Sequence, residues 1–196
     1  MDDLSEALFS PERVWSRSEV LSRPSPAPAE PGIYAWYFKN LPPTVTASDC
    51  VRFRGLTLLY VGISPARATT KGIPSRRNIR NRLREHLRRN ASSSTLRLSL
   101  GCLLSEKLGI ELRRVGGSKR LTFSTGEATL NGWLDDNAFV TWAVVTEPWK
   151  YEADIVSRVS LPLNLDHNDG HRFREKLSAV RHEARQQARR RRVLRK

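Results

Sequence analysis

The stretches GIYAWYF, at residues 32–38, and LTLLYVG, at residues 56–62, decide the fold that this sequence predicts. Aromatic and β-branched side chains dominate both stretches, and such side chains favour β-strands. Alternation along the first stretch places Tyr34 and Ile33 on opposite faces of its strand. Along the second stretch it places Tyr60 on the same face as Leu58. We therefore expect two neighbouring antiparallel strands that each carry one tyrosine.

A third strand is expected at residues 139–145. The predicted fold is thus a mixed α/β (α+β) domain, with a small, three-stranded, mainly antiparallel sheet flanked by helices. The sequence predicts helices at residues 10–20, 78–89, 95–108 and 125–137, and from Pro148 to about residue 159. Ser124 and Glu127 predict a capping box before the fourth of these helices. A hairpin that turns at Gly116 and Gly117 is expected within residues 111–123.

The helix at residues 78–89 is amphipathic. Ile79, Leu83 and Leu87 recur at the spacing of one helix face and predict its buried stripe. Arg82 and His86 are four residues apart and lie beside this stripe. We expect both side chains at the edge between core and solvent, where a cleft can form.

The charge of the chain is concentrated in two segments. The formal net charge is +14, while residues 67–89 carry a net +8 and residues 171–196 a net +9. The remainder of the chain is therefore slightly acidic. Two localised basic surfaces predict a polyanionic partner such as nucleic acid. The alternative, that these charges only keep the protein soluble, stays open.

Proline-rich residues 23–31, RPSPAPAEP, predict an extended connector. We expect an N-terminal helix and connector at residues 1–30, the main domain at 31–170, and a basic C-terminal helix at 171–196. Residues 90–137 form an insertion-like block within the main domain. The block could contact nucleic acid, pack against a partner, or enlarge the core.

The sequence indicates a cytoplasmic protein. Cys50 and Cys102 form no metal-binding or paired motif, so we expect two free thiols in a reducing compartment. No apolar run approaches the length of a membrane span, and the N-terminus does not resemble a signal peptide. We also find no P-loop motif for nucleotide binding.

Several motifs occur in a fixed order along the chain. These are GIY at residues 32–34, YVG at residues 60–62, the pair Arg82 and His86 on a basic helix, then Glu152, and finally PLN at residues 162–164. This order resembles the GIY-YIG nuclease family, over about residues 31–168. The resemblance implies a metal-dependent endonuclease that hydrolyses the phosphodiester bonds of DNA.

The resemblance also implies roles for six residues. The catalytic candidates are Tyr34, Tyr60, Arg82, His86, Glu152 and Asn164. Tyr60 would orient or deprotonate the attacking water, although a tyrosine needs nearby cations to lower its pKa for this task. Arg82 would lower that pKa and bind phosphoryl oxygens, and His86 would relay a proton. Tyr34 would hydrogen-bond the phosphate or the water, and Asn164 would help to build the site.

Glu152 is the expected ligand of a divalent cation, Mg²⁺ or alternatively Mn²⁺. The expected contacts with nucleic acid come from Gly62, Lys71, Arg76, Arg80, Arg89 and Arg172. Gly62 would let the backbone turn sharply behind Tyr60. His167 and His171 are spaced like a metal pair, but the residues between them favour a turn.

Three questions stay open at this point. The fold could instead serve a catalytically silent nucleic-acid-binding module, or the substrate could be RNA. The oligomeric state could be a monomer or a homodimer. The arginine-rich run at residues 181–196 suits contacts with a phosphate backbone, although it could also be a solvated tail.

Overall fold

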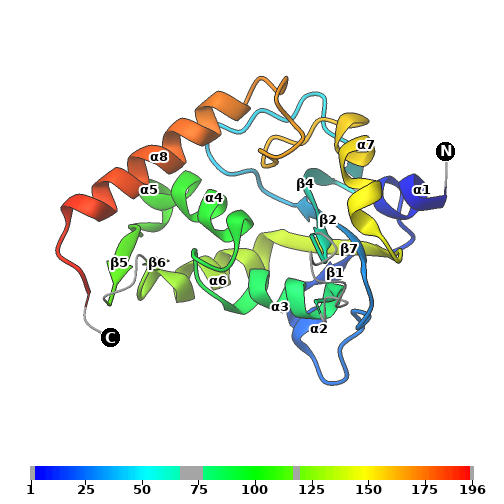
Figure 1. Cartoon of the computed structure of the whole chain (residues 1–196), viewed down its shortest axis with the longest axis horizontal. Helices are drawn as coiled ribbons and strands as arrows, with labels where there is room; N and C mark the ends of the chain where they lie inside the picture. Colours follow the sequence, from blue (N-terminus) through cyan, green and yellow to red (C-terminus); the bar gives the residue numbers. More distant parts are fainter. Residues whose placement is uncertain (1–2, 67–76, 117–119, 195–196) are drawn as a thin grey trace, which may run out of the picture.

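The computed structural model of this 196-residue chain describes residues 3–66, 77–116 and 120–194. Its centre is an antiparallel sheet of five strands in the order β1–β7–β2–β4–β3 (Figure 1). The strands are β1 (Trp15–Ser16), β2 (Gly32–Phe38), β3 (Arg52–Phe53), β4 (Leu56–Ser64) and β7 (Ala138–Val144). The prediction of three strands is wrong because β1 and β3 extend the sheet at its edges. Each has only two residues, too few to show alternation in the sequence.

The predicted antiparallel pairing of β2 with β4 is confirmed, but the pairing contains a β-bulge. Trp36 pairs with Tyr60 and Tyr37 pairs with Leu58, so that Leu59 has no partner of its own. Tyr60 therefore lies on the face opposite Leu58, and the prediction that they share a face is wrong. The extra residue at the bulge shifts the alternation by one position.

Helices cover both faces of the sheet. The face of Tyr34, Trp36 and Phe38 packs against α2 (Arg17–Leu21), α3 (Ile79–Arg88) and α6 (Gly126–Asn137). The face of Ile33 and Tyr37 packs against α1 (Asp3–Phe9) and α7 (Glu152–Ser157). The alternation predicted along residues 32–38 thus separates two hydrophobic cores. The predicted buried stripe of α3 is confirmed, since Ile79, Leu83 and Leu87 are fully buried.

The N-terminal segment differs from the predicted single helix at residues 10–20. α1 ends at Phe9, and Trp15 pairs with Val140 as part of β1. Ser16 then caps α2 in a capping box, in which the Glu19 carboxylate accepts a hydrogen bond of 2.8 Å from the Ser16 backbone N–H. Pairing with the sheet edge thus replaces the first turns of the predicted helix.

The block at residues 90–137 contains α4 (Thr95–Leu103), α5 (Ser105–Leu108), β5 (Arg113–Val115), β6 (Arg120–Thr122) and α6. The hairpin of β5 and β6 is confirmed, while the helix predicted at 95–108 breaks at Leu104. The capping box predicted from Ser124 and Glu127 is wrong, because Thr125 precedes α6 without a side-chain cap. The Glu127 carboxylate instead accepts hydrogen bonds from the backbone N–H groups of Ala91 and Phe123.

The helix predicted from Pro148 to residue 159 is divided. A 3₁₀ turn, η1 (Pro148–Lys150), precedes α7, and Tyr151 separates the two. Glu152 is consequently the first residue of α7. None of the helices that the structure describes is long and apolar enough to cross a membrane.

The basic C-terminal helix, α8 (Arg174–Arg190), packs along α4 and buries Leu177 and Ala188 (Figure 1). It ends at Arg190, and Leu194 pairs with Val115 of β5. The described part of the C-terminal run is thus packed against the domain, unlike a solvated tail. Cys50 and Cys102 are both free, as predicted, and both are buried.

Candidate active site

Tyr34 and Gly62 face each other across β2 and β4, where they form a register pair. A Cβ atom on Gly62 would lie 2.6 Å from the Tyr34 hydroxyl oxygen. Gly62 therefore provides the space that the buried Tyr34 ring occupies. The expected sharp turn at Gly62 is wrong, since β4 continues through this residue to Ser64.

The Tyr34 hydroxyl begins a chain of buried hydrogen bonds. It lies 2.9 Å from His86 Nε2, and His86 Nδ1 lies 2.7 Å from the Ser94 hydroxyl. His86 is only 1% exposed, so its predicted position at the edge of the core is wrong. The helix rotates it inward, beside the Tyr34 and Trp36 rings. Burial holds the pKa of His86 well below its ordinary value, and the charges of Arg82 and Arg97 act in the same direction.

Arg82 lies at the mouth of this network and is partly exposed. Its Nη1 donates to the Glu85 carboxylate at 2.8 Å and to the Ser93 carbonyl oxygen at 3.0 Å. Arg82 also lines a surface pocket of about 470 Å³, together with residues 91–95 from the start of the insertion block. The prediction for Arg82 at the edge between core and solvent is therefore confirmed.

Tyr60 projects from β4 toward the same cluster, where its ring centroid lies 6.2 Å from that of His86. Burial raises the pKa of Tyr60, although a hydrogen bond from Thr95 and the charge of Arg82 act to lower it. Burial likewise raises the pKa of Tyr34 against the opposing influence of Arg82. Arg82 thus acts in the expected direction, but burial outweighs it and both tyrosines are neutral phenols at neutral pH.

Glu152 reaches the cluster from the N-terminus of α7. Its negative charge contributes to raising the pKa of both Tyr34 and Tyr60. The carboxylate is partly exposed and lies 3.8 Å from His167 Nε2. Within residues 3–66, 77–116 and 120–194, no group of three or more His, Cys, Asp or Glu side chains is arranged to hold a metal ion. A cation at Glu152 would therefore need ligands from water and substrate in addition to those that the protein provides.

Asn164 supports the site without facing it. Its side-chain oxygen accepts a hydrogen bond of 2.9 Å from the Val61 N–H, and its amide donates to the Val61 carbonyl oxygen at 2.8 Å. These bonds provide partners for the Val61 backbone groups at the edge of β4, where β3 no longer pairs with it. Asn164 thereby fixes the backbone between Tyr60 and Gly62.

His171 takes no part in a metal pair with His167. Its Nε2 lies 3.0 Å from the Ser160 hydroxyl, and its Nδ1 accepts a hydrogen bond from the Phe173 N–H. Both ring nitrogens therefore have partners within the fold. The turn favoured by the intervening residues is present at residues 169–170.

The residues predicted to contact nucleic acid are dispersed. Arg80 donates to the Ala27 carbonyl oxygen at 2.6 Å, and Arg89 is exposed directly after α3. Arg172 bonds to Ser48 and lies 3.0 Å from the Asp49 carboxylate. Lys71 and Arg76 lie outside the described residues. Contact of these residues with nucleic acid stays a prediction.

The sequence analysis missed the contribution of the insertion block. Ser94 completes the His86 network and also caps α4 by accepting from the Arg97 N–H at 3.0 Å. Arg97 is 1% exposed and is bonded to Glu127, Asn131 and the His86 carbonyl oxygen. The run SSST at residues 92–95 is a usable capping signal, since serine before a helix often caps it.

The fold and this cluster define a protein of the GIY-YIG class. The family of the GIY-YIG catalytic domain matches residues 32–183, which include β2, β4, α3 and Glu152. The chain belongs to the GIY-YIG family, and this membership indicates a nuclease that acts on nucleic acid. Comparisons with curated proteins and with solved structures found no match.

Proposed function

We propose that this protein is a divalent-metal-dependent endonuclease that hydrolyses phosphodiester bonds in DNA. The observation that carries the proposal is the gathering of Tyr34, Tyr60 and Arg82 around the buried His86, with Glu152 close enough to influence the pKa of both tyrosines. The family supports the reaction class, and the electrostatic influence of Arg82 and Glu152 on both tyrosines supports a shared site for the four residues.

Arg82 would bind the phosphoryl oxygens at the mouth of the site. Burial acts to lower its pKa, but the nearby tyrosines and Glu85 outweigh burial and raise it, so Arg82 carries a positive charge throughout the physiological pH range. A fixed cation beside the phosphorus stabilises the negative charge that develops there in the transition state. The bond to the Ser93 carbonyl oxygen holds the guanidinium in place before substrate arrives.

Tyr60 would orient the attacking water. As a neutral phenol it can accept a hydrogen bond from the water and donate one to a phosphate oxygen. Deprotonation of Tyr60 would require its pKa to fall from the raised value it has in the free protein. Tyr34 is less accessible and would transmit proton movement to His86. In the tautomer with the proton on Nδ1, the neutral ring would accept at Nε2 from Tyr34 and donate from Nδ1–H to Ser94.

Glu152 would hold the divalent cation, for which Mg²⁺ fits best. Mg²⁺ keeps several water ligands and often uses one or two carboxylates plus substrate oxygens, whereas structural zinc sites need about four protein ligands. The partly exposed carboxylate at the start of α7 has room for such outer ligands. When bound, the cation would supply positive charge that neutralises the phosphate and lowers the pKa of nearby water and hydroxyl groups.

The test is a cleavage assay on single-stranded, duplex and branched DNA and on RNA, each with EDTA, Mg²⁺ or Mn²⁺. We expect metal-dependent cutting of DNA that Glu152→Ala abolishes. Asp154→Ala is the matched control, because Asp154 is a carboxylate of the same helix whose ion pair is with Arg158. Cutting of RNA but not of DNA would show that RNA is the substrate. Binding without cutting by the unchanged protein, under every metal condition, would indicate a catalytically silent module.

The two free thiols of Cys50 and Cys102 support a reducing compartment such as the cytoplasm as the place of action.

A further inference from the structure

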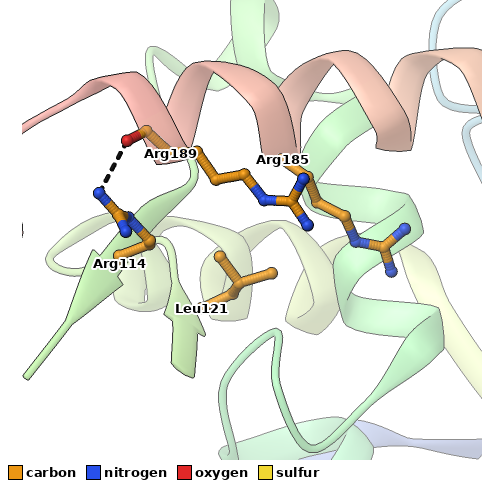
Figure 2. A pocket seen from close by; sticks show the side chains of 4 residues that line it. All are labelled: Arg114, Leu121, Arg185 and Arg189. Atoms are coloured by element: carbon orange, nitrogen blue, oxygen red, sulfur yellow. Dashed lines mark hydrogen bonds between the residues drawn. The ribbon is translucent and has the colours of Figure 1, made fainter. Parts of the chain in front are cut away.

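Two surface pockets form one groove that begins at the candidate active site. The pocket at Arg82 continues along the hairpin to Arg120, Leu121 and Arg185. The next pocket, of about 400 Å³, is lined by Arg114, Leu121, Arg185 and Arg189 (Figure 2). Because Leu121 and Arg185 line both pockets, the groove runs from α3 over the β5–β6 hairpin to the last turn of α8. We call this surface the arginine groove.

Three cations of the arginine groove have no acidic partner in the part of the chain that the structure describes. Among the described residues, the side chains of Arg120, Arg185 and Arg189 have no hydrogen bond and no ion pair, and no carboxylate lines either pocket. Arg17 and Arg113, by contrast, are surface arginines that are paired with Asp or Glu. Unpaired like charges along a concave surface repel one another, and a polyanion would relieve this repulsion.

Arg114 gives the groove a fixed shape. Its Nε donates to the Ala188 carbonyl oxygen at 3.2 Å, and its Nη2 donates to the Arg189 carbonyl oxygen at 2.7 Å (Figure 2). These are terminal carbonyls of α8 that lack partners within the helix, so Arg114 caps its C-terminus. The Gly116 N–H also donates to the Leu194 carbonyl oxygen at 2.9 Å. The hairpin and the C-terminal segment are therefore joined, and the groove is a built concavity.

The spacing of the groove suits a phosphate chain. Arg185 and Arg189 are one helical turn apart, about 6 Å along the axis of α8. Figure 2 shows both side chains extending from α8 above Leu121. The pocket that Arg185 and Arg82 share is also lined by residues 92–95, which give it a polar wall, and the Ser92 and Ser93 hydroxyls are held by bonds to the carbonyl oxygens of Leu121 and Asn90. The groove thus offers a succession of cations and polar groups that starts at the expected position of the cleaved bond.

We propose that the arginine groove binds the phosphodiester backbone of the nucleic-acid substrate on one side of the cleaved bond. Arg82 contacts the phosphate that is cut, and Arg120, Arg185 and Arg189 contact phosphates farther along the strand. This inference rests on the proposed function, and it assigns the insertion block and α8 a joint role in holding substrate.

Binding of a labelled oligonucleotide in EDTA tests the proposal without cleavage. The variant R185Q/R189Q removes two cations from the groove. The control K176Q/R190Q removes the same charge from exposed positions of the same helix that line neither pocket. We expect about tenfold weaker binding for the groove variant and a shift below twofold for the control. The binding constant of the groove variant should also depend less on salt. A plot of its logarithm against the logarithm of the salt concentration should have a slope shallower by about 1.5.

Equal losses in both variants, or no loss in either, would overturn the proposal, as would no binding by the unchanged protein. Single-stranded DNA, duplex DNA and RNA serve as separate probes, and heparin serves as a non-nucleic polyanion. A groove effect confined to heparin would also overturn it. Thermal unfolding of each variant separates lost binding from lost folding.

A second readout separates this inference from the proposed function. Bis(4-nitrophenyl) phosphate is too small to extend from Arg82 to Arg189, so its metal-dependent hydrolysis by the unchanged protein reports on the active site without the groove. If the unchanged protein hydrolyses neither this diester nor nucleic acid, the proposed function fails, while the binding comparison still decides on the groove. If it cleaves long DNA and R185Q/R189Q does so equally well at low substrate concentration, the groove proposal fails alone.

Discussion

The candidate active site and the arginine groove meet at Arg82, yet they use arginine in opposite ways. Arg97, behind the cluster, is 1% exposed and bonded to Glu127, Asn131 and the His86 carbonyl oxygen. Arg185, in the groove, is partly exposed and has no hydrogen bond or ion pair among the described residues. A buried cation needs partners that replace water, whereas an exposed one can remain available for a ligand. The first arrangement fixes geometry, and the second leaves charge for binding.

The cluster itself is largely uncharged inside. Tyr34, His86 and Ser94 form a neutral hydrogen-bonded chain, and Arg82 and Glu152 provide the charges at its mouth. Such an arrangement is organised before substrate arrives, so the geometry of the cluster should change little with salt concentration. The groove should instead depend strongly on salt, because its contacts with phosphate release counterions. The following predictions test this division, from the largest expected effect to the smallest.

Arg82→Ala should give the largest change, because it removes a cation that both regions share. We expect cleavage to fall by about 10²- to 10³-fold, the usual loss when one transition-state donor is removed. Arg84→Ala, two residues along the same helix, should stay within a few-fold of the unchanged protein. Single-turnover cleavage rates measure the effect, and comparable rates for the two variants would show that Arg82 has no catalytic role.

Arg97→Met should destabilise the fold by about 3 kcal/mol, because it leaves the half-buried Glu127 carboxylate without its cation. Arg185→Met should change the free energy of unfolding by less than about 0.5 kcal/mol, as is usual for unpaired surface positions. Urea denaturation measures both values. If the two substitutions cost the same, the contrast between buried and exposed arginines is mistaken.

Gly62→Ala should destabilise the protein by about 1–3 kcal/mol, because the new Cβ would clash with the Tyr34 ring. Cleavage should fall as well, since Tyr34 must move. Gly132→Ala is the control, because Gly132 lies in α6 with open space around it and alanine favours helices. Denaturation should show that this control is neutral or slightly more stable, and a neutral Gly62→Ala would refute the proposed packing of Tyr34.

The buried His86 should make stability dependent on pH. Its pKa is lowered in the folded protein, so the unfolded chain binds the additional proton below its own pKa of about 6.5. The stability that neutral His86 provides is therefore present above that pH and is lost as the pH falls, by at most about 1.4 kcal/mol per pH unit. Denaturation at pH 7.5 and 5.5 should show a smaller loss in His86→Gln than in the unchanged protein.

His182→Gln provides the comparison for this pH effect, because His182 is exposed on α8. This variant should lose stability between pH 7.5 and 5.5 to the same extent as the unchanged protein. An unchanged pH dependence in His86→Gln would mean that other groups, such as the partly buried His171, account for the effect.

The contributions of sequence and structure can be separated at particular residues. The strands around Tyr34 and Tyr60, their antiparallel pairing, the helix of Arg82 and the hairpin at Gly116 follow from alternation, helical spacing and turn residues, which are local patterns. The inward position of His86 does not follow from its spacing alone, because a partner eight residues away, Ser94, makes its burial favourable. Whether the tyrosines are neutral also depends on burial, which local sequence does not specify.

The sequence by itself determined the family, the order of the motifs, the main strands and the two basic segments. Only the tertiary structure decided that β1 and β3 widen the sheet, that a bulge at Leu59 sets the face of Tyr60, and that the hairpin joins α8 to form a groove. The physical reason is that periodicity arises within one segment. Edge pairing, shifts of register and shared pockets are contacts between distant segments, and their free energy depends on which groups the fold brings together.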